Sequence, residues 1–223
     1  MKSFGAAKQR LAGRLGMGSR QALAQAMFSD VLASLRHVEG LDAIAVVTAD
    51  RVAEAAALGG GVQVLRDPDE AGQSAAALIG IRYAQASGFE RVLLVPGDTP
   101  LLAPAEITEL LERAAERGLG VVIVPDRHGT GTNALVLSPP DAIEPSFGAG
   151  SFERHVAAAR AAGLANAVDL VPSLMFDVDT YDDLSELSAE LAERRGKAPL
   201  TRGALRQLDR SRARSMATAG GRA

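Results

Sequence analysis

The sequence predicts a single α/β domain in three layers, with helices covering both faces of a mixed, mostly parallel β-sheet. Short apolar runs rich in Val, Ile and Leu alternate with longer windows of helical periodicity. These runs are continuous rather than alternating with polar residues, which is typical of strands buried on both faces. A chain of 223 residues, 47% hydrophobic and 23% charged, is sufficient for one domain with a complete core.

The expected strands are the short apolar runs. The run AIAVVTA combines strand length with β-branched residues, and RVLLVP is the strongest of the set. In chain order, we expect strands at residues 43–49, 62–65, 91–96, 119–125, 133–139, 167–170 and 174–179. The strands at 120–124 and 133–137 are separated only by the loop DRHGTGT, so a hairpin-like pair makes the sheet mixed.

The windows between these runs have the apolar spacing of helices. In chain order, we expect helices at residues 19–37, 50–58, 73–87, 104–118, 151–163 and 180–195. Pro104 stands near the first position of its helix, where the N–H that proline lacks is not needed. Asp182 and Asp183 lie in the first turn of the last helix, where negative charge is favourable. The domain is therefore expected to span residues 1–196.

Both ends of the chain depart from this scheme. A basic loop begins at residue 2, where sheets of this kind usually have a first strand. Either that strand is absent or the chain begins downstream of the true start, and we favour the second alternative. Residues 197–223 carry many cations against Asp209 alone, among Gly and Ala. They predict a basic, disordered tail, either solvated without a role or an arm that binds a polyanion.

Composition excludes several classes of function. The chain has no cysteine, which excludes disulfides, zinc–thiolate sites and thiol nucleophiles and suits a cytoplasmic protein. The net charge of −3 gives no general attraction to nucleic acid. No apolar run approaches the roughly 18 residues of a membrane helix, and the N-terminus lacks the apolar segment of a secretory signal. We expect a cytoplasmic protein that binds neither nucleic acid nor a membrane.

The first chemical signal is the basic segment KSFGAAKQRLAGRL at residues 2–15, which gathers Lys2, Lys8, Arg10 and Arg14. A glycine-containing loop that enters a helix presents N–H groups to phosphate oxygens, and Lys and Arg add charge for a triphosphate. The GK[ST] of a Walker A loop is missing. Taken alone, the segment also fits a solvated, basic helix start.

An acidic residue follows the strongest expected strand. Asp98 comes directly after Pro96 and Gly97, at the strand end where ligands bind in parallel sheets. Pro100 restricts Thr99 to extended conformations and so fixes the exit path of the chain. A carboxylate here is a typical Mg²⁺ ligand of phosphate-transfer sites, because hard cations prefer oxygen. A loop or helix N-cap role is the alternative.

A second acidic group lies in FDVDTYDDL at residues 176–184. Asp177 and Asp179 stand at alternate positions of an expected strand, so their side chains should point to the same side. With Asp98 they could hold one or two Mg²⁺ ions, which bridge phosphate oxygens and offset charge during an in-line displacement.

Two glycine-containing loops supply neutral donors. PDRHGTGTNAL contains Thr132, and PSFGAGSFERH places Gly148 before Ser151 at a helix start. A helix N-terminus with free N–H groups and a hydroxyl is an anion site, although each loop alone also fits a turn with a cap. Together they favour a small anionic substrate. We expect His128 and His155 to be structural or on the surface, since transfer to an existing phosphate needs no strong base.

These segments, in this order, resemble the guanylyltransferases of coenzyme F-420 biosynthesis over residues 2 to 190, and GTGTNAL with FGAGSFERH is the specific part. The resemblance implies a Rossmann-like nucleotidyltransferase fold related to glycosyltransferase type A domains. It also implies transfer of GMP from GTP to a phosphorylated three-carbon acid, with release of pyrophosphate. The acid would be phosphoenolpyruvate, 2-phospho-L-lactate or 3-phosphoglycerate. The high Ala, Gly and Arg content suggests a GC-rich genome and favours phosphoenolpyruvate, the substrate of actinobacterial members.

The resemblance assigns roles to individual residues. The carboxylates that match its metal ligands, with Mg²⁺ as cofactor, are Asp98, Asp177 and Asp179. The residues expected to carry catalysis are Asp98, Asp179, Lys8 and Arg10. The positions that match the binding site of the acid are Thr132, Gly148 and Ser151. The residues expected to bind the nucleotide are Lys2, Lys8, Arg10, Gln73 and Ser74, the last two replacing a Leu-Asn pair of many family members.

Other functions stay open at this point. One alternative is another nucleotidyltransferase of the superfamily, such as a molybdopterin or sugar-phosphate enzyme. Another is a non-catalytic module that binds a nucleotide without releasing pyrophosphate. The resemblance also leaves room for a homodimer and for hand-off of the product to the next enzyme of the deazaflavin pathway.

Overall fold

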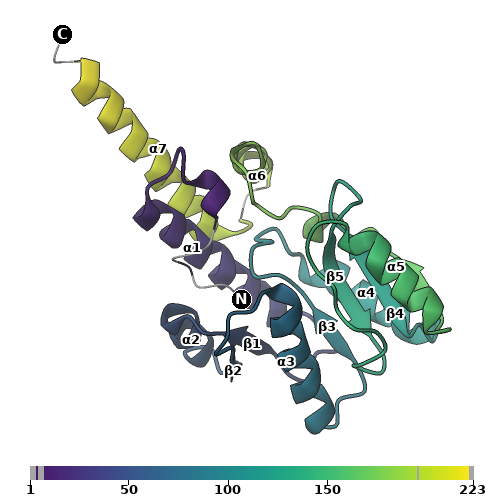
Figure 1. The fold of residues 1–223 in the computed structure, drawn as a ribbon. Coiled ribbons are helices and arrows are strands. Elements are labelled where there is room, and N and C mark those ends of the chain that lie inside the picture. Colours follow the sequence, from purple (N-terminus) through teal and green to yellow (C-terminus); the bar gives the residue numbers. More distant parts are fainter. Residues whose placement is uncertain (1–3, 5–7, 195, 221–223) are drawn as a thin grey trace.

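The computed structural model describes residue 4 and residues 8–194 and 196–220, with side chains described as far as residue 211. It is an α/β structure in which helices lie on both sides of the strands (Figure 1). No helix in the described ranges is long and apolar enough to cross a membrane. Lys2, which the resemblance predicts to bind the nucleotide, lies outside the described residues.

The described strands form two sheets. Strand β1 (Ala45–Thr48) pairs in parallel with β2 (Gln63–Arg66). The second sheet has the order β3–β5–β4–β6. Its strands are β3 (Val92–Leu94), β4 (Val121–Pro125), β5 (Thr132–Leu137) and β6 (Asn166–Val168). Strand β5 runs antiparallel to β3 and β4, whereas β4 and β6 are parallel. The expected mixed sheet with its hairpin is confirmed.

All six expected helices are present. They are α1 (Met17–Leu35), α2 (Arg51–Leu58), α3 (Gln73–Ala86), α4 (Pro104–Glu116), α5 (Ser151–Ala161) and α6 (Tyr181–Glu193). Short 3-10 helices occur at η2 (Gln9–Leu11) and η3 (Pro172–Leu174). Asp50 caps α2 by accepting from two backbone N–H groups, and Thr180 with Asp183 forms a capping box at the start of α6. Pro104 opens α4, as predicted.

Strands β4 and β5 form the centre of the core, because every residue of both is buried. Val122 and Val124 pack with α4 on one face, whereas Val121 and Ile123 pack with α3 and α5 on the other. Each fully buried aliphatic side chain of this kind stabilises the fold by about 1.5–3 kcal/mol. The continuous apolar pattern therefore follows from three layers, with helices on both sides of the sheet.

The expectation of a disordered tail is wrong for residues 199–220, because Pro199–Gly220 forms helix α7 along α1 (Figure 1). Leu205 and Leu208 are buried in the same cluster as the apolar face of α1. Asp30 of α1 is buried and accepts from the backbone N–H of Thr201 at 2.7 Å, which fixes the start of α7. The few leucines of this segment were hidden among arginines, yet their spacing of three places them on one helical face.

The strand expected at 174–179 is also wrong. The segment begins in η3, and residues 176–179 form no strand. Leu174 and Val178 are fully buried, which explains the strand-like apolar pattern. The segment pairs with none of the described strands, so Asp177 and Asp179 are held by an irregular loop. Their common orientation therefore cannot be argued from strand alternation.

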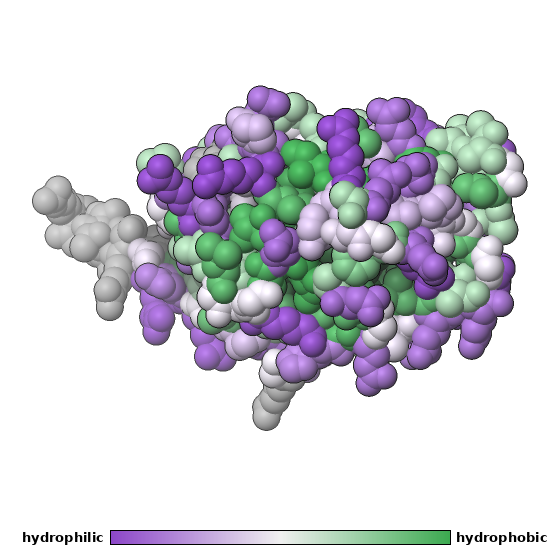
Figure 2. Space-filling view, turned by 90° about the horizontal axis from the view of Figure 1, so that it is seen from below, coloured by the Kyte–Doolittle hydropathy of each residue, from purple (hydrophilic) through white to green (hydrophobic). Residues whose placement is uncertain are grey.

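Strands β1 and β3 each pair with only one other strand among the described residues, and both border the same cavity. The three residues of β3 are only partly buried, in contrast to those of β4 and β5. Seen from below, hydrophobic side chains gather in the middle of the molecular face, with hydrophilic ones around them (Figure 2). The region between the two sheets is thus less tightly packed than the core around β4 and β5.

Candidate functional site

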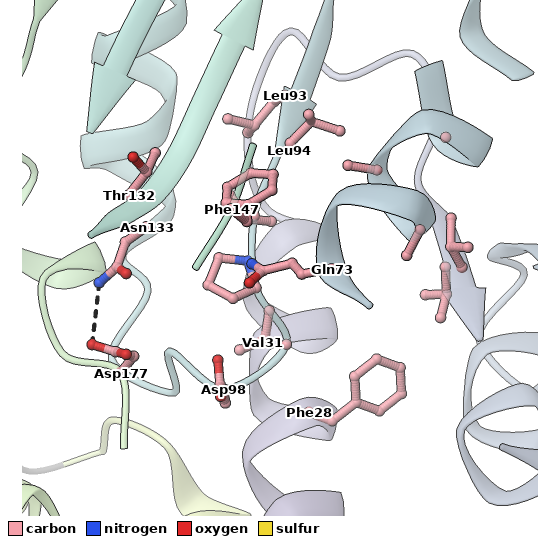
Figure 3. A pocket seen from close by; sticks show the side chains of 18 of the residues that line it. Phe28, Val31, Gln73, Leu93, Leu94, Asp98, Thr132, Asn133, Phe147 and Asp177 are labelled. Atoms are coloured by element: carbon pink, nitrogen blue, oxygen red, sulfur yellow. Dashed lines mark hydrogen bonds between the residues drawn. The ribbon is translucent and has the colours of Figure 1, made fainter. Parts of the chain in front are cut away.

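A cavity of about 1630 Å³ opens between the β1–β2 pair and the four-stranded sheet. Figure 3 shows Thr132, Asn133 and Asp177 on one side of it and Phe28 on the other, with Asp98 and Gln73 between them. Pockets for one small ligand typically have roughly 300–1,000 Å³. The cavity therefore has room for two substrates bound side by side.

Lys8 brings two of the predicted carboxylates together. Its Nζ lies 2.5 Å from Asp98 Oδ2 and 3.3 Å from Asp179 Oδ1, and its side chain is only 4% exposed. Burial opposes the charged form of Lys8, but the two carboxylates outweigh it, so the pKa of Lys8 is raised. A full positive charge therefore lies between Asp98 and Asp179.

The backbone supports this position of the Lys8 side chain. Lys8 has φ 56° and ψ 39°, a left-handed conformation that a residue with a side chain seldom adopts. It directly precedes η2, whose Leu11 is buried in the core. Arg10 of η2 is largely exposed, and its Nη1 lies 3.8 Å from Asp179 Oδ2. Backbone strain of this kind clusters at functional sites, where the surrounding structure maintains it.

Asp177 completes an acidic group next to this pair. Burial raises its pKa, and the negative charges of Asp98 and Asp179 raise it further. Asn133 Nδ2 donates to Leu174 O at 2.7 Å and to Asp177 Oδ1 at 3.4 Å. Asn133 belongs to the loop PDRHGTGTNAL, which the sequence predicts to supply neutral donors, and its amide donates toward Asp177.

The three carboxylates do not form a preformed metal cluster, since the described residues contain no converging group of three metal-ligating side chains. Asp98 and Asp179 converge instead on the ammonium group of Lys8. Carboxylate oxygens are the ligands that hard divalent cations prefer. These two residues could therefore hold a divalent cation if Lys8 moved away from them.

His155 orients the hydroxyl of Thr132. His155 is fully buried, and its Nε2 accepts from the backbone N–H of Ser146 at 2.8 Å. Burial, and then the charge of Arg154, lowers the pKa of His155 to about 4, so the ring is neutral at pH 7. A neutral ring with an accepting Nε2 carries its proton on Nδ1, which lies 2.9 Å from Thr132 Oγ1. The Thr132 hydroxyl thus accepts from His155 and keeps its own proton for another partner.

The second predicted donor loop lies beside Thr132. Gly148 and Gly150 have φ 108° and 69°, conformations that glycine permits without strain. Gly150 is the N-cap of α5, and Ser151, which follows it, is buried and lines the cavity. Within the described part of the chain, the N–H groups of Gly148 and Gly150 donate no hydrogen bond. These groups and the N-terminus of α5 form an environment that favours an anion.

The remaining predicted residues lie around this centre. Gln73 lines the cavity at the start of α3. The Ser74 hydroxyl accepts from the backbone N–H of Phe147 at 2.9 Å, so it holds the second donor loop in place. His128 is exposed and His155 is buried, in agreement with the surface and structural roles expected for them. Asp183 caps α6 and pairs with Arg127, which also contacts Glu186.

Comparisons with known proteins find relatives over nearly the whole chain. Residues 1–210 match the family described as "Guanylyl transferase CofC like". The chain is 50% identical over 211 residues to a phosphoenolpyruvate guanylyltransferase of Conexibacter woesei, and the match covers 95% of each chain. It is 36% identical over 185 residues to a 2-phospho-L-lactate guanylyltransferase of Methanothermobacter thermautotrophicus, covering 82% of this chain and 79% of that protein.

A solved structure shows the same fold. A putative nucleotide-diphospho-sugar transferase from Desulfovibrio desulfuricans G20 superimposes with a TM-score of 0.70 at 21% identity, covering 94% of this chain and 92% of that one. At this identity the likeness shows the fold alone, which is the α/β nucleotidyltransferase fold that the resemblance implies. The family match over nearly the whole chain and the relative at 50% identity show more: the chain belongs to the CofC-like guanylyltransferase family.

Proposed function

We propose that the protein transfers GMP from GTP to phosphoenolpyruvate and releases pyrophosphate, as a step of coenzyme F-420 biosynthesis. The observation that carries the proposal is that one cavity contains two kinds of group for binding anions. The first is the Lys8 ammonium, which lies between the carboxylates of Asp98 and Asp179. The second is a pair of neutral donor loops that line the same cavity. The relative at 50% identity is named for this substrate, whereas the archaeal relative at 36% identity is named for 2-phospho-L-lactate.

The reaction needs alignment rather than a strong base. An oxygen of the acid's phosphate attacks the α-phosphorus of GTP, and the bond to the bridging oxygen of the β-phosphate breaks. The attacking oxygen is already ionised near pH 7, because the second pKa of a phosphate monoester is about 6. The main obstacle is the approach of two anions. Positioned positive charge and donors lower this barrier by stabilising the charge of the transition state.

The described residues divide this task. Thr132 and the N-terminus of α5 would bind the acid, with the Thr132 hydroxyl donating to its phosphate or carboxylate. Lys8 and Arg10 would stabilise the leaving pyrophosphate. Asp98 and Asp179, with Asp177 beside them, have the oxygen ligands that fit Mg²⁺, which when bound supplies charge neutralisation on the phosphates. Both substrates are metabolites of the cell interior, so the proposed reaction takes place in the cytoplasm. A homodimer and hand-off of the product to the next enzyme stay predictions.

Pyrophosphate release tests the proposal directly. Purified protein with GTP and Mg²⁺ should release pyrophosphate in the presence of phosphoenolpyruvate, and faster than with 2-phospho-L-lactate or 3-phosphoglycerate at equal concentration. The reaction without any acid is the control and should show no release above background. Comparable release without acid would contradict the transfer, and faster release with another acid would move the assignment to that substrate.

The contacts of His155 with Thr132 and Ser146 predict an effect on binding of the acid without an effect on binding of GTP. In His155→Gln the longer amide can still accept from Ser146, but it loses the donor to Thr132, so KM for phosphoenolpyruvate should rise about 3–10-fold, the value of one hydrogen bond. In His155→Asn the shorter amide keeps a donor near the position of Nδ1, so KM should change less. KM for GTP should stay unchanged in both variants. Steady-state kinetics with each substrate varied in turn measures the difference, and equal effects of the two variants would contradict the positioning role.

A further inference from the structure

Asp67 is a buried carboxylate that the proposed reaction has not yet used. It follows β2, is only 3% exposed and lines the cavity. Its backbone N–H donates to Thr48 O at 3.2 Å, which fixes it beyond the end of the β1–β2 pair. Its Oδ1 is buried and has no hydrogen-bond partner among the described residues. The main chain of Asp67 is therefore held in place, while an acceptor of its side chain is free.

The described structure provides no structural role for this carboxylate. The helix before it, α2, is capped by Asp50, and the helix after it has Gly72 as its N-cap. None of the ion pairs between described residues includes Asp67. Pro68 restricts its backbone to extended conformations and so limits its freedom to turn outward. A buried carboxylate oxygen without a donor is unfavourable, so a ligand with N–H groups would bind well here.

The position of Asp67 separates it from the groups that would bind phosphates. Asp98 follows β3 of the other sheet and Asp179 lies in the loop before α6, and both contact Lys8. Asp67 belongs to the end of β1 and β2, where Phe4 also lies, because Phe4 N–H donates to Asp50 Oδ2 at 2.8 Å. A carboxylate repels phosphate but accepts from a neutral base. The nucleoside end of the substrate therefore fits this part of the cavity.

Aromatic side chains make the same part of the cavity suitable for a flat base. Phe4 and Phe28 both line the cavity and contact each other edge to face, with their ring centroids 5.8 Å apart. Apolar walls with a few placed polar groups are typical of sites for bases and cofactors. This end of the cavity thus combines an apolar surface with one unpaired acceptor.

We propose that Asp67 recognises the nucleobase of the substrate by accepting hydrogen bonds from N1–H and from the 2-amino group of guanine. Guanine presents these two donors side by side, in the fork that a carboxylate accepts with both oxygens. Adenine and cytosine each place a ring-nitrogen acceptor next to their amino group, which would face the carboxylate unfavourably. Asp67 thereby selects GTP over other nucleoside triphosphates. This inference rests on the proposed function, since it takes the donor nucleotide to be GTP.

An exchange of nucleotide preference tests the proposal. Xanthine has a carbonyl where guanine has the 2-amino group, so an amide at position 67 can accept from N1–H and donate to that carbonyl. Asp67→Asn should lower kcat/KM for GTP about 10–100-fold, because matched polar contacts to guanine are lost. The variant gains matched contacts to xanthine, so its kcat/KM for xanthosine triphosphate should rise above its kcat/KM for GTP. The control is Asp69→Asn, the same change at an exposed residue of the same loop outside the cavity lining, which should leave the preference unchanged.

Nucleotide binding to the unmodified protein provides an independent test of the proposal. GTP methylated at N1 lacks one of the two donors and should bind at least about 10-fold more weakly than GTP in calorimetry without acid. This experiment needs no turnover, so it separates failure of base reading from failure of the transfer reaction, and it also applies if Asp67→Asn does not fold. Equal affinity for the methylated nucleotide, or an unchanged GTP preference in folded Asp67→Asn, would overturn the proposal.

Discussion

Asp98→Asn should lower kcat for pyrophosphate release at least about 100–1000-fold, the effect of removing one electrostatic group from a transition-state site. The amide keeps the size of the carboxylate but loses the charge that pairs with Lys8 and that fits Mg²⁺. The fold should persist, because the side chain of Asp98 is one-third exposed and the chain around it is anchored by the fully buried Thr99. Initial rates at saturating GTP and phosphoenolpyruvate measure the change.

Two further measurements make this experiment decisive. Asp141→Asn removes an exposed carboxylate outside the cavity lining and should keep the kcat of the unmodified protein. Calorimetric titration with Mg²⁺ should show weaker binding to Asp98→Asn than to that control. A folded Asp98→Asn variant with a near-normal rate would show that Asp98 is not part of the catalytic group.

The local parts of the site could be predicted from the sequence because they depend on local patterns. Asp98 was recognised because an apolar run ends at Pro96-Gly97, and the structure places it in the cavity at the end of β3. The helix start at Ser151 was predicted from glycines before a hydroxyl, and α5 begins there. Both signals rest on the short-range geometry of strand ends and helix caps, which a few neighbouring residues determine.

The contacts within the site could not be predicted, since they join distant segments. Lys8 lies 90 residues from Asp98 and 171 from Asp179 along the chain, and no periodicity encodes a contact at that separation. Asp67 stands in a DPDE sequence that is typical of a turn, and only its burial distinguishes it from the exposed Asp69. Asp177 and Asp179 line the same cavity as Asp98, but strand alternation is not the reason, because no strand holds them.

The ends of the chain were the hardest to predict. Helix α7 was missed because its two buried leucines, Leu205 and Leu208, stand in a segment rich in arginine. Their apolar face is recognisable only once α1 is known to pack against it.

Lys8→Met should lower kcat about 100-fold and, at the same time, tighten the binding of Mg²⁺ in the absence of substrates. The ammonium of Lys8 and a divalent cation compete for the same oxygens of Asp98 and Asp179, so removing the ammonium removes the competitor. Catalysis still suffers, because the same charge would stabilise the leaving pyrophosphate once the metal and GTP are bound. A residue that only held the loop in place would weaken both properties.

The matched control for this variant is Arg10→Met. Arg10 is largely exposed and only 3.8 Å from one oxygen of Asp179, so its charge is screened by solvent and competes little with a metal. Calorimetry should therefore show tighter Mg²⁺ binding in Lys8→Met than in Arg10→Met. In thermal unfolding, Lys8→Met should lose stability without Mg²⁺ and regain more than the control when Mg²⁺ is added, because ligand binding stabilises the folded state in proportion to affinity. Unchanged Mg²⁺ affinity in Lys8→Met would mean that the metal and Lys8 do not share a position, and that Lys8 stays on the carboxylates throughout the reaction.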